Sequence, residues 1–180
     1  MSSPSVIQFG AFNPRQNLPA AVARKRGESN FLAAFQRDFT ASRAGQGVGG
    51  RHFSLFGYGI ADFVWMDFSY SGKPHGPHEP ILTAFELKLK NWKKAISQAH
   101  RYRYFSDRSI VVLPEDAADR AEQHLSIFVH LGVGLWSFNP KTFGIQMRFT
   151  PADTKAKNPE ARERAVAHIS RKLNLRKAPK

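Results

Sequence analysis

The sequence of 180 residues contains no cysteine and only three methionines and three tryptophans. The absence of cysteine excludes disulfides, thiolate metal sites and cysteine nucleophiles. No stretch approaches the roughly 20 continuous apolar residues that a bilayer crossing needs, so we expect no membrane partner. Residues 1–17 have neither a charged start nor an apolar block, unlike a secretion signal. Together these absences predict a cytoplasmic protein.

Acidic residues are also scarce. The chain has 14 Asp and Glu against 27 Lys and Arg, which gives a formal net charge of +13. A surface this basic attracts polyanions, and nucleic acid is the commonest polyanion inside a cell. The alternative is a solvated basic surface with no particular partner. Acidic membranes are a weaker alternative, because no basic helix with an apolar Trp/Leu face stands out.

The length and the apolar fraction of 42% fit a single domain with a real core. We predict three regions along the chain. Residues 1–27, which contain three prolines, form an irregular lead-in. Residues 28–150 form the domain itself, and residues 151–180 form a basic C-terminal helix that packs on the domain or extends it.

Hydrophobic periodicity predicts a mixed α/β fold with one central sheet. Apolar residues recur at helical spacing near residues 31–39, 92–102 and 116–131, and again after Pro159. Gly45, Gly47, Gly49 and Gly50 indicate a flexible turn. Runs rich in β-branched and aromatic residues predict the strands, which are His52–Tyr58, Ile60–Tyr70, Ile81–Leu89, Ser109–Leu113, Val133–Asn139 and Phe143–Thr150.

The strand Ile81–Leu89 ends with a carboxylate and an ammonium. Because side chains alternate along a strand, Glu86 and Lys88 share one face with Leu82 and Ala84. Upstream, Asp62 is a lone carboxylate within an apolar strand. If these two strands pair, Asp62 and Glu86 converge. The alternative is an edge-strand charge pair that faces solvent.

Such a group of residues is suited to the cleavage of phosphodiester bonds. Hard Mg²⁺ prefers carboxylate oxygens, and a bound metal neutralises the phosphate and polarises a water molecule. Two neighbouring carboxylates repel each other until a cation binds. An adjacent lysine orients the attacking water and stabilises the negative charge that grows on the phosphate.

The order Asp62, then Glu86-Leu87-Lys88, then Gln98 and Tyr102 on the next helix resembles the PD-(D/E)xK nuclease superfamily. The spacing of Gln98 and Tyr102 resembles the QxxxY motif of its RecB nuclease-domain branch. The resemblance covers residues 28–114. Ala61 stands where the name-giving proline would be. This resemblance implies a restriction-endonuclease-like α-β-β-β-α-β core.

The resemblance also implies roles for individual residues. Asp62 and Glu86 would hold Mg²⁺ or Mn²⁺, the Leu87 carbonyl oxygen would be a third ligand, and Lys88 would be the catalytic lysine. Glu28 resembles an extra acidic residue that some members place beside the metal, although an exposed carboxylate at a helix start is the equal alternative. Gln98 and Tyr102 lie on one helical face and would line the site or touch the DNA backbone.

Basic residues gather close to this group. We predict that they form a phosphate track, with a merely solvated helix face as the alternative. The candidates are Lys90, Lys93, Lys94, Arg101 and Arg103, joined by the tail residues Arg171, Lys172, Arg176 and Lys177. His75 and His78 have a loose metal-ligand spacing, but no third ligand is near them in the sequence, so we interpret them as loop residues.

The sequence therefore predicts a magnesium-dependent deoxyribonuclease, with endonuclease action favoured. From the family resemblance, the products would carry a 5′-phosphate, and a homodimer is a further possibility. The alternative is a catalytically inactive DNA-binding or assembly module that keeps the nuclease fold.

Overall fold

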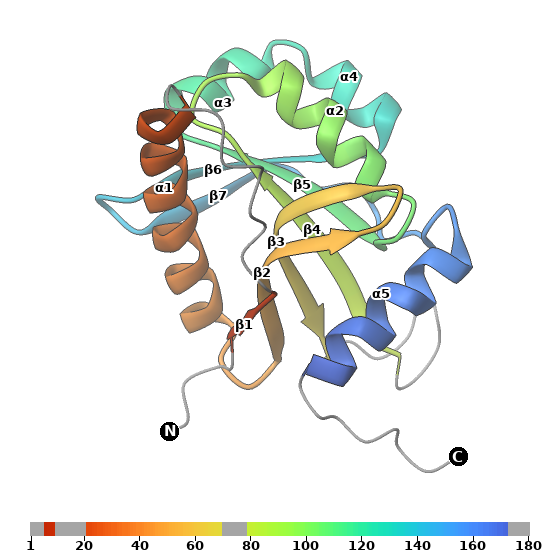
Figure 1. The fold of residues 1–180 in the computed structure, drawn as a ribbon. Helices are drawn as coiled ribbons and strands as arrows, with labels where there is room; N and C mark the ends of the chain where they lie inside the picture. The colour runs from red at the N-terminus through yellow and green to blue at the C-terminus, as the bar shows by residue number, and fades with distance from the viewer. Residues whose placement is uncertain (1–5, 10–20, 70–78, 173–180) are drawn as a thin grey trace.

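A computed structural model describes residues 6–9, 21–69 and 79–172. Within these residues, seven strands form one mixed sheet in sequence order, from β1 at one edge to β7 at the other (Figure 1). The pairs β1–β2, β4–β5 and β5–β6 are parallel, and the others are antiparallel. The strands are β1 (Val6–Gln8), β2 (Gly47–Leu55), β3 (Gly59–Asp67), β4 (Ile81–Leu87), β5 (Arg108–Leu113), β6 (Gly134–Asn139) and β7 (Gly144–Phe149).

Helices cover both faces of the sheet (Figure 1). They are α1 (Ala21–Ser42), α2 (Trp92–Tyr102), α3 (Glu115–Glu122), α4 (Leu125–Leu131) and α5 (Pro159–Lys172). The α/β class with a central mixed sheet flanked by helices is therefore confirmed. From α1 to β5 the elements follow the order helix, three strands, helix, strand.

The face that α1 covers is rich in aromatic rings. Phe35 and Phe39 of α1 lie against Phe63 of β3 and Phe85 of β4, with ring centroids 5.1–6.4 Å apart. These rings are almost completely buried, and each aromatic side chain removes about 150–250 Å² from water. The helical spacing of Phe35 and Phe39 and the alternation in the strands produce this layer.

The opposite face carries α2, α3, α4 and α5. Leu82 and Ala84 of β4 belong to this second core, whereas Phe85 and Leu87 belong to the first. The predicted alternation along β4 is therefore confirmed. It follows that Glu86, which continues the series of Leu82 and Ala84, lies on the α2 face.

Of the glycines predicted to form a flexible turn, Gly45 lies in a turn with φ of 80°, whereas the other three lie in a strand. Gly47, Gly49 and Gly50 lie within β2. A Cβ atom on Gly49 would lie 2.6 Å from the Phe63 ring, and one on Gly50 would collide with Phe9. Large rings therefore occupy the space above these glycines, and their small size allows a strand to form there.

Two other boundaries differ from the prediction. The lead-in 1–27 contains strand β1, and helix α1 begins at Ala21, so the described parts of this region are regular. The helix predicted over 116–131 is two helices, α3 and α4, with a break at His124. The ring of His124 stacks on Trp92 of α2 with centroids 5.1 Å apart, a tertiary contact that helical periodicity does not encode.

Helix α5 packs on the domain through Ala161, Ala165 and Ile169. Its Arg162 donates through Nε to Asp107 Oδ1 at 2.7 Å, and Asp107 Oδ2 accepts from the amide of Leu82. A buried ion pair thus joins α5 to the start of β4. In the part of the chain that the structure describes, no helix has the length and apolar character needed to cross a membrane.

Candidate active site

Glu86 and Lys88 lie at the C-terminal end of β4, beside α1 and α2 (Figure 1). The Glu86 side chain is only 1% exposed, and its Oε1 is 3.0 Å from Lys88 Nζ. Its Oε2 accepts a hydrogen bond of 2.6 Å from the hydroxyl of Tyr102 on α2. The carboxylate is therefore fixed between an ammonium and a phenol.

Asp62 of β3 lies opposite Glu86. Phe63 pairs with Phe85 in the antiparallel β3–β4 ladder, and the same register continued by one residue sets Asp62 against Glu86, with side chains on one face. Asp62 Oδ2 accepts a hydrogen bond of 2.8 Å from the amide of Leu87. The two strands pair as the sequence predicts, and the two carboxylates meet. The role of the Leu87 carbonyl oxygen stays a prediction.

Tyr102 links the helix to both strands. Its hydroxyl oxygen lies 2.6 Å from the Ile60 carbonyl oxygen and 2.6 Å from Glu86 Oε2. A phenol has a single proton to donate. When that proton goes to Ile60, the carboxyl of Glu86 has to supply the proton of the other bond. When it goes to Glu86, the carboxylate is ionised.

Burial and charge perturb all four groups of the site. Burial raises the pKa of Glu86 to about 7, helped by the neighbouring Asp62 and opposed by Lys88. Burial also raises the pKa of Asp62, against the opposing effects of Lys88 and the Leu87 amide. Burial alone would lower the pKa of Lys88, but Glu86 and Asp62 outweigh it and the pKa is raised. Burial and Glu86 raise the pKa of Tyr102.

Glu28 reaches the same group from α1. Its Oε2 lies 3.6 Å from Lys88 Nζ, and its side chain is 39% exposed. Gly27 lets α1 approach closely here, since a Cβ atom at this position would be 3.1 Å from the Leu89 side chain. Glu28 therefore lies at the outer rim of the site and neutralises part of the Lys88 charge.

The carboxylates have the chemistry of a magnesium site. Glu86 Oε1 is buried, and the Lys88 ammonium lies 3.0 Å from it. No group of three or more His, Asp or Glu side chains suited to a metal occurs in the described ranges. Mg²⁺ needs no such group, because it is commonly bound by one or two carboxylates and several waters. Asp62 and Glu86 fit that pattern.

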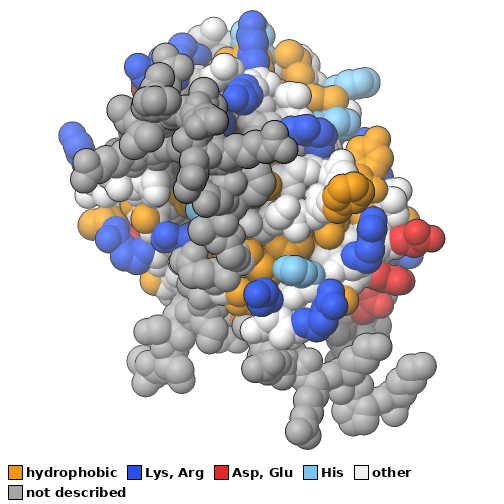
Figure 2. Space-filling view, in the orientation of Figure 1, with side chains coloured by type: hydrophobic (Ala, Val, Ile, Leu, Met, Phe, Trp, Pro, Cys, Tyr) orange, Lys and Arg blue, Asp and Glu red, His pale blue; other side chains and the backbone are white. Residues whose placement is uncertain are grey.

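The predicted basic track is only partly at the surface. Lys90, Lys93, Lys94 and Arg101 are exposed, and Figure 2 shows Lys and Arg side chains spread over one face of the molecule. Arg103 is buried instead, at 8% exposure, and donates to the Asp107 carbonyl oxygen. The prediction that Arg103 belongs to a phosphate track was therefore wrong. Helical periodicity does not reveal which basic side chain is buried by a distant part of the chain.

Other predicted residues occupy different places. Gln98 is half-buried, and its Oε1 is buried without a hydrogen-bond partner in the described part of the chain. Tyr102 is completely buried, so it lines the site and does not reach a surface phosphate. Arg171 and Lys172 are exposed on α5. The predictions for His75, His78, Arg176 and Lys177 lie outside the described residues.

The structure adds His52, which sequence reasoning missed. Arg51 pairs with Phe63 and Phe53 pairs with Ala61, so His52 occupies the position opposite Asp62 on β2. Its backbone has φ of 52°, which is uncommon for a residue other than glycine. Its side chain is exposed, and its charge lowers the pKa of Asp62 against the larger effects of burial. No sequence signal distinguishes it from an ordinary strand residue.

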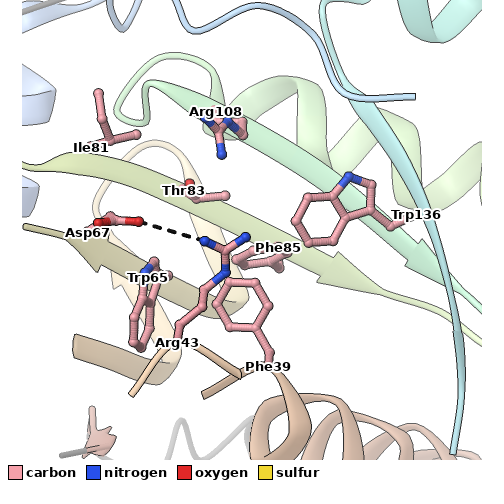
Figure 3. A pocket seen from close by; sticks show the side chains of 9 residues that line it. All are labelled: Phe39, Arg43, Trp65, Asp67, Ile81, Thr83, Phe85, Arg108 and Trp136. Atoms are coloured by element: carbon pink, nitrogen blue, oxygen red, sulfur yellow. Dashed lines mark ion pairs between the residues drawn. The ribbon is translucent and has the colours of Figure 1, made fainter. Parts of the chain in front are cut away.

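The enclosed cavity of Figure 3 lies elsewhere. It is on the α1 face, where Arg43 forms an ion pair with Asp67 beside Phe39 and Trp136. Its volume of about 20 Å³ holds roughly one water molecule. None of the residues predicted to act on a substrate lines it.

Comparison with protein-family models finds no matching family, and comparison with curated proteins finds no matching relative. Among solved structures, the chain is similar to a protein of unknown function from Silicibacter pomeroyi. The two share 16% sequence identity with a TM-score of 0.46, over 73% of this chain and 80% of the other.

Proposed function

We propose that the protein is a metal-dependent nuclease that hydrolyses phosphodiester bonds of DNA. One observation carries the proposal. A half-buried carboxylate, Asp62, and a buried carboxylate, Glu86, lie side by side on neighbouring strands, and the partly buried ammonium of Lys88 is 3.0 Å from Glu86 Oε1. A protein that needed only stability would not gain from two adjacent carboxylates that repel each other. A metal-dependent site that cleaves phosphodiesters uses both carboxylates to hold the metal ion.

Each side chain has a task that its contacts support. Asp62 and Glu86 would hold the cation, which when bound neutralises phosphate charge and polarises a water molecule. The Leu87 amide orients Asp62, and the Tyr102 hydroxyl orients Glu86. These two hydrogen bonds fix the orientation of the carboxylate oxygens, as supporting hydrogen bonds do around metal ligands in general.

Lys88 would act on the reacting phosphate. Its side chain is 14% exposed, and its ammonium lies 3.0 Å from Glu86 Oε1 and 3.6 Å from Glu28 Oε2. An ammonium in this place donates hydrogen bonds to the attacking water and to a phosphate oxygen, whose negative charge grows in the transition state. The exposed Lys93 and Lys94 of α2 would hold neighbouring phosphates. The order helix, three strands, helix, strand also agrees with the restriction-endonuclease-like core that the sequence resembles.

The experiment is a plasmid-nicking assay with Mg²⁺ or Mn²⁺, each with and without chelator. We expect nicked and linear products that disappear with chelator and in the Lys88→Met variant. Retention of plasmid without cleavage under all metals would favour the alternative, an inactive nuclease-fold DNA-binding module. Cleavage that persists in both chelator and the Lys88→Met variant would point to a contaminating enzyme.

A further inference from the structure

The turn between β2 and β3 presents an aromatic side chain to solvent. Phe56 is 93% exposed, the highest value among the large apolar side chains that the structure describes. Gly57 and Gly59 both have positive φ, at 88° and 92°, and this conformation lets the chain reverse tightly. The amide of Tyr58 donates to the Leu55 carbonyl oxygen at 3.0 Å. Phe56 therefore stands at the tip of a closed turn.

The base of this turn is held from two sides. The Tyr58 ring stacks on Tyr104, with centroids 5.7 Å apart and planes inclined by 24°. Its hydroxyl accepts a hydrogen bond of 2.9 Å from Asn158. The ammonium of Lys157 lies 5.5 Å from the centre of the Tyr104 ring. Tyr58, Tyr104 and Lys157 thus lie together at the base of the turn that carries Phe56, and these four residues are here called the aromatic patch.

The aromatic patch continues directly into the candidate active site. Tyr102, two residues before Tyr104, contacts both Glu86 and the Ile60 carbonyl oxygen. Ile60 lies two residues after Tyr58 on the same hairpin. At about 3.3 Å per strand residue, the four steps from Tyr58 to Asp62 span about 13 Å. This length, from Asp62 to the base of the turn that carries Phe56, equals about four nucleotides stacked at 3.4 Å.

We propose that the aromatic patch binds an unpaired base of the DNA strand whose phosphate lies at Asp62 and Glu86. Phe56 supplies the stacking face, and Lys157 meets the adjoining phosphate. The inference rests on the proposed function and narrows its substrate to single-stranded DNA or an unpaired end. Inside a duplex both faces of every base pair are covered, so an interior base can stack on Phe56 only when it is unpaired.

The composition of the patch favours this occupant over a protein. A stable protein–protein interface buries on the order of 800 Å² on each partner, whereas the aromatic patch offers one fully exposed ring, a half-buried tyrosine pair and a cation. Aromatic rings next to a cation are the combination that single-strand binders use, because every base has a face to stack and every nucleotide has a charge.

The test measures binding without cleavage. Full-length protein carrying Lys88→Met is titrated, in chelator, against a fluorescent single-stranded oligonucleotide and against the blunt duplex of the same sequence. Phe56→Ala should weaken single-strand binding about 5- to 150-fold, which is the loss of one base–aromatic stack. Phe56→Trp should keep the affinity. The salt dependence should not change, because no ionic contact is removed.

Phe143→Ala is the matched control. Phe143 is 59% exposed in the turn between β6 and β7, and it contacts Arg37 of α1. Its removal should leave single-strand binding unchanged. Equal affinities for the parent and Phe56→Ala on the single strand would overturn the inference, as would an equal loss on both DNA forms.

Failure of the proposed function looks different. If metal-loaded protein cleaves no DNA while Phe56→Ala still loses single-strand affinity, the proposed DNA binding by the aromatic patch is supported and the proposed nuclease activity is refuted. If the protein cleaves DNA and Phe56→Ala binds as the parent does, this inference fails alone.

Discussion

The substitution Glu86→Gln separates a metal site from a structural ion pair by the sign of a stability change. Glutamine keeps the shape of Glu86 and can still accept the hydrogen bond from Tyr102, but it carries no charge. In the parent protein without metal, the buried carboxylate is held next to Asp62, and both effects oppose its ionisation. We therefore expect the variant to be more stable than the parent in chelator at pH 8.

The size of the effect follows from the pKa. The pKa of Glu86 is about 7 in the folded protein against an ordinary value of 4.5, and this difference corresponds to about 3 kcal/mol. Below pH 4.5 both the folded and the unfolded chain hold the proton, so the parent and the variant should be equally stable. Between pH 4.5 and 7 only the unfolded chain ionises, so the parent loses stability. Above pH 7 the loss is complete and stays constant.

Thermal unfolding in chelator from pH 4 to pH 9 measures this difference. For a chain of this length, about 3 kcal/mol corresponds to roughly 6–12 °C in Tm, in favour of Glu86→Gln at pH 8. Adding Mg²⁺ should then raise the Tm of the parent and move the variant less. A structural Glu86–Lys88 bridge predicts the opposite sign, since removing one partner of a buried pair costs about 3–5 kcal/mol. A lower Tm for Glu86→Gln at pH 8 would refute the reasoning.

Three further predictions concern the site and its surroundings. Lys88→Met should lower DNA cleavage about 10²–10³-fold, the effect of losing one electrostatic donor, with affinity in chelator unchanged; equal losses of both would make Lys88 a plain phosphate contact. Replacing Lys93 and Lys94 by alanine should make the slope of log affinity against log salt shallower by about 1.8. Lys141→Ala serves as the control. An unaltered slope in the double variant would place the DNA on another face. Asp62→Asn should be at least as stable as the parent in chelator, because asparagine can still accept from the Leu87 amide, and it should not respond to Mg²⁺; a clear loss of Tm would assign Asp62 a structural role.

Much of the sheet could be predicted because side-chain periodicity records which face is buried. The alternation around Glu86 placed it on the face of Leu82 and Ala84, and the structure has the same arrangement. The helix after Asn91 was equally predictable, since Asn91 Oδ1 accepts from the amide of Lys94 as an N-cap does. Local patterns of this kind depend on neighbours in the sequence.

The failures come from contacts between distant segments. The glycines of β2 do not form the predicted turn because the rings that need their space, Phe9 just after β1 and Phe63 in β3, are distant from them in the sequence. Arg103 was expected at the surface, but its guanidinium lies beside Gly132 and donates to the Asp107 carbonyl oxygen. Asp107 is four residues from Arg103, whereas Gly132 is distant from it in the sequence. The periodicity of apolar residues indicates which face of a helix or strand is buried. It does not indicate which residue from elsewhere in the chain packs on that face.

His52 shows the same limit at the site itself. A histidine with φ of 52° carries backbone strain of about 1–2 kcal/mol, which glycine would relieve, although glycine costs roughly 0.5–1 kcal/mol of chain entropy. The substitution His52→Gly should therefore leave the Tm within a few degrees of the parent. If the imidazole contacts the substrate phosphate beside Asp62, cleavage should fall about 10- to 150-fold, the loss of one hydrogen bond to a charged group. His52→Asn tolerates the same backbone and should retain part of the activity. Undiminished cleavage by His52→Gly, together with an unchanged Tm, would show that His52 takes no part in cleavage.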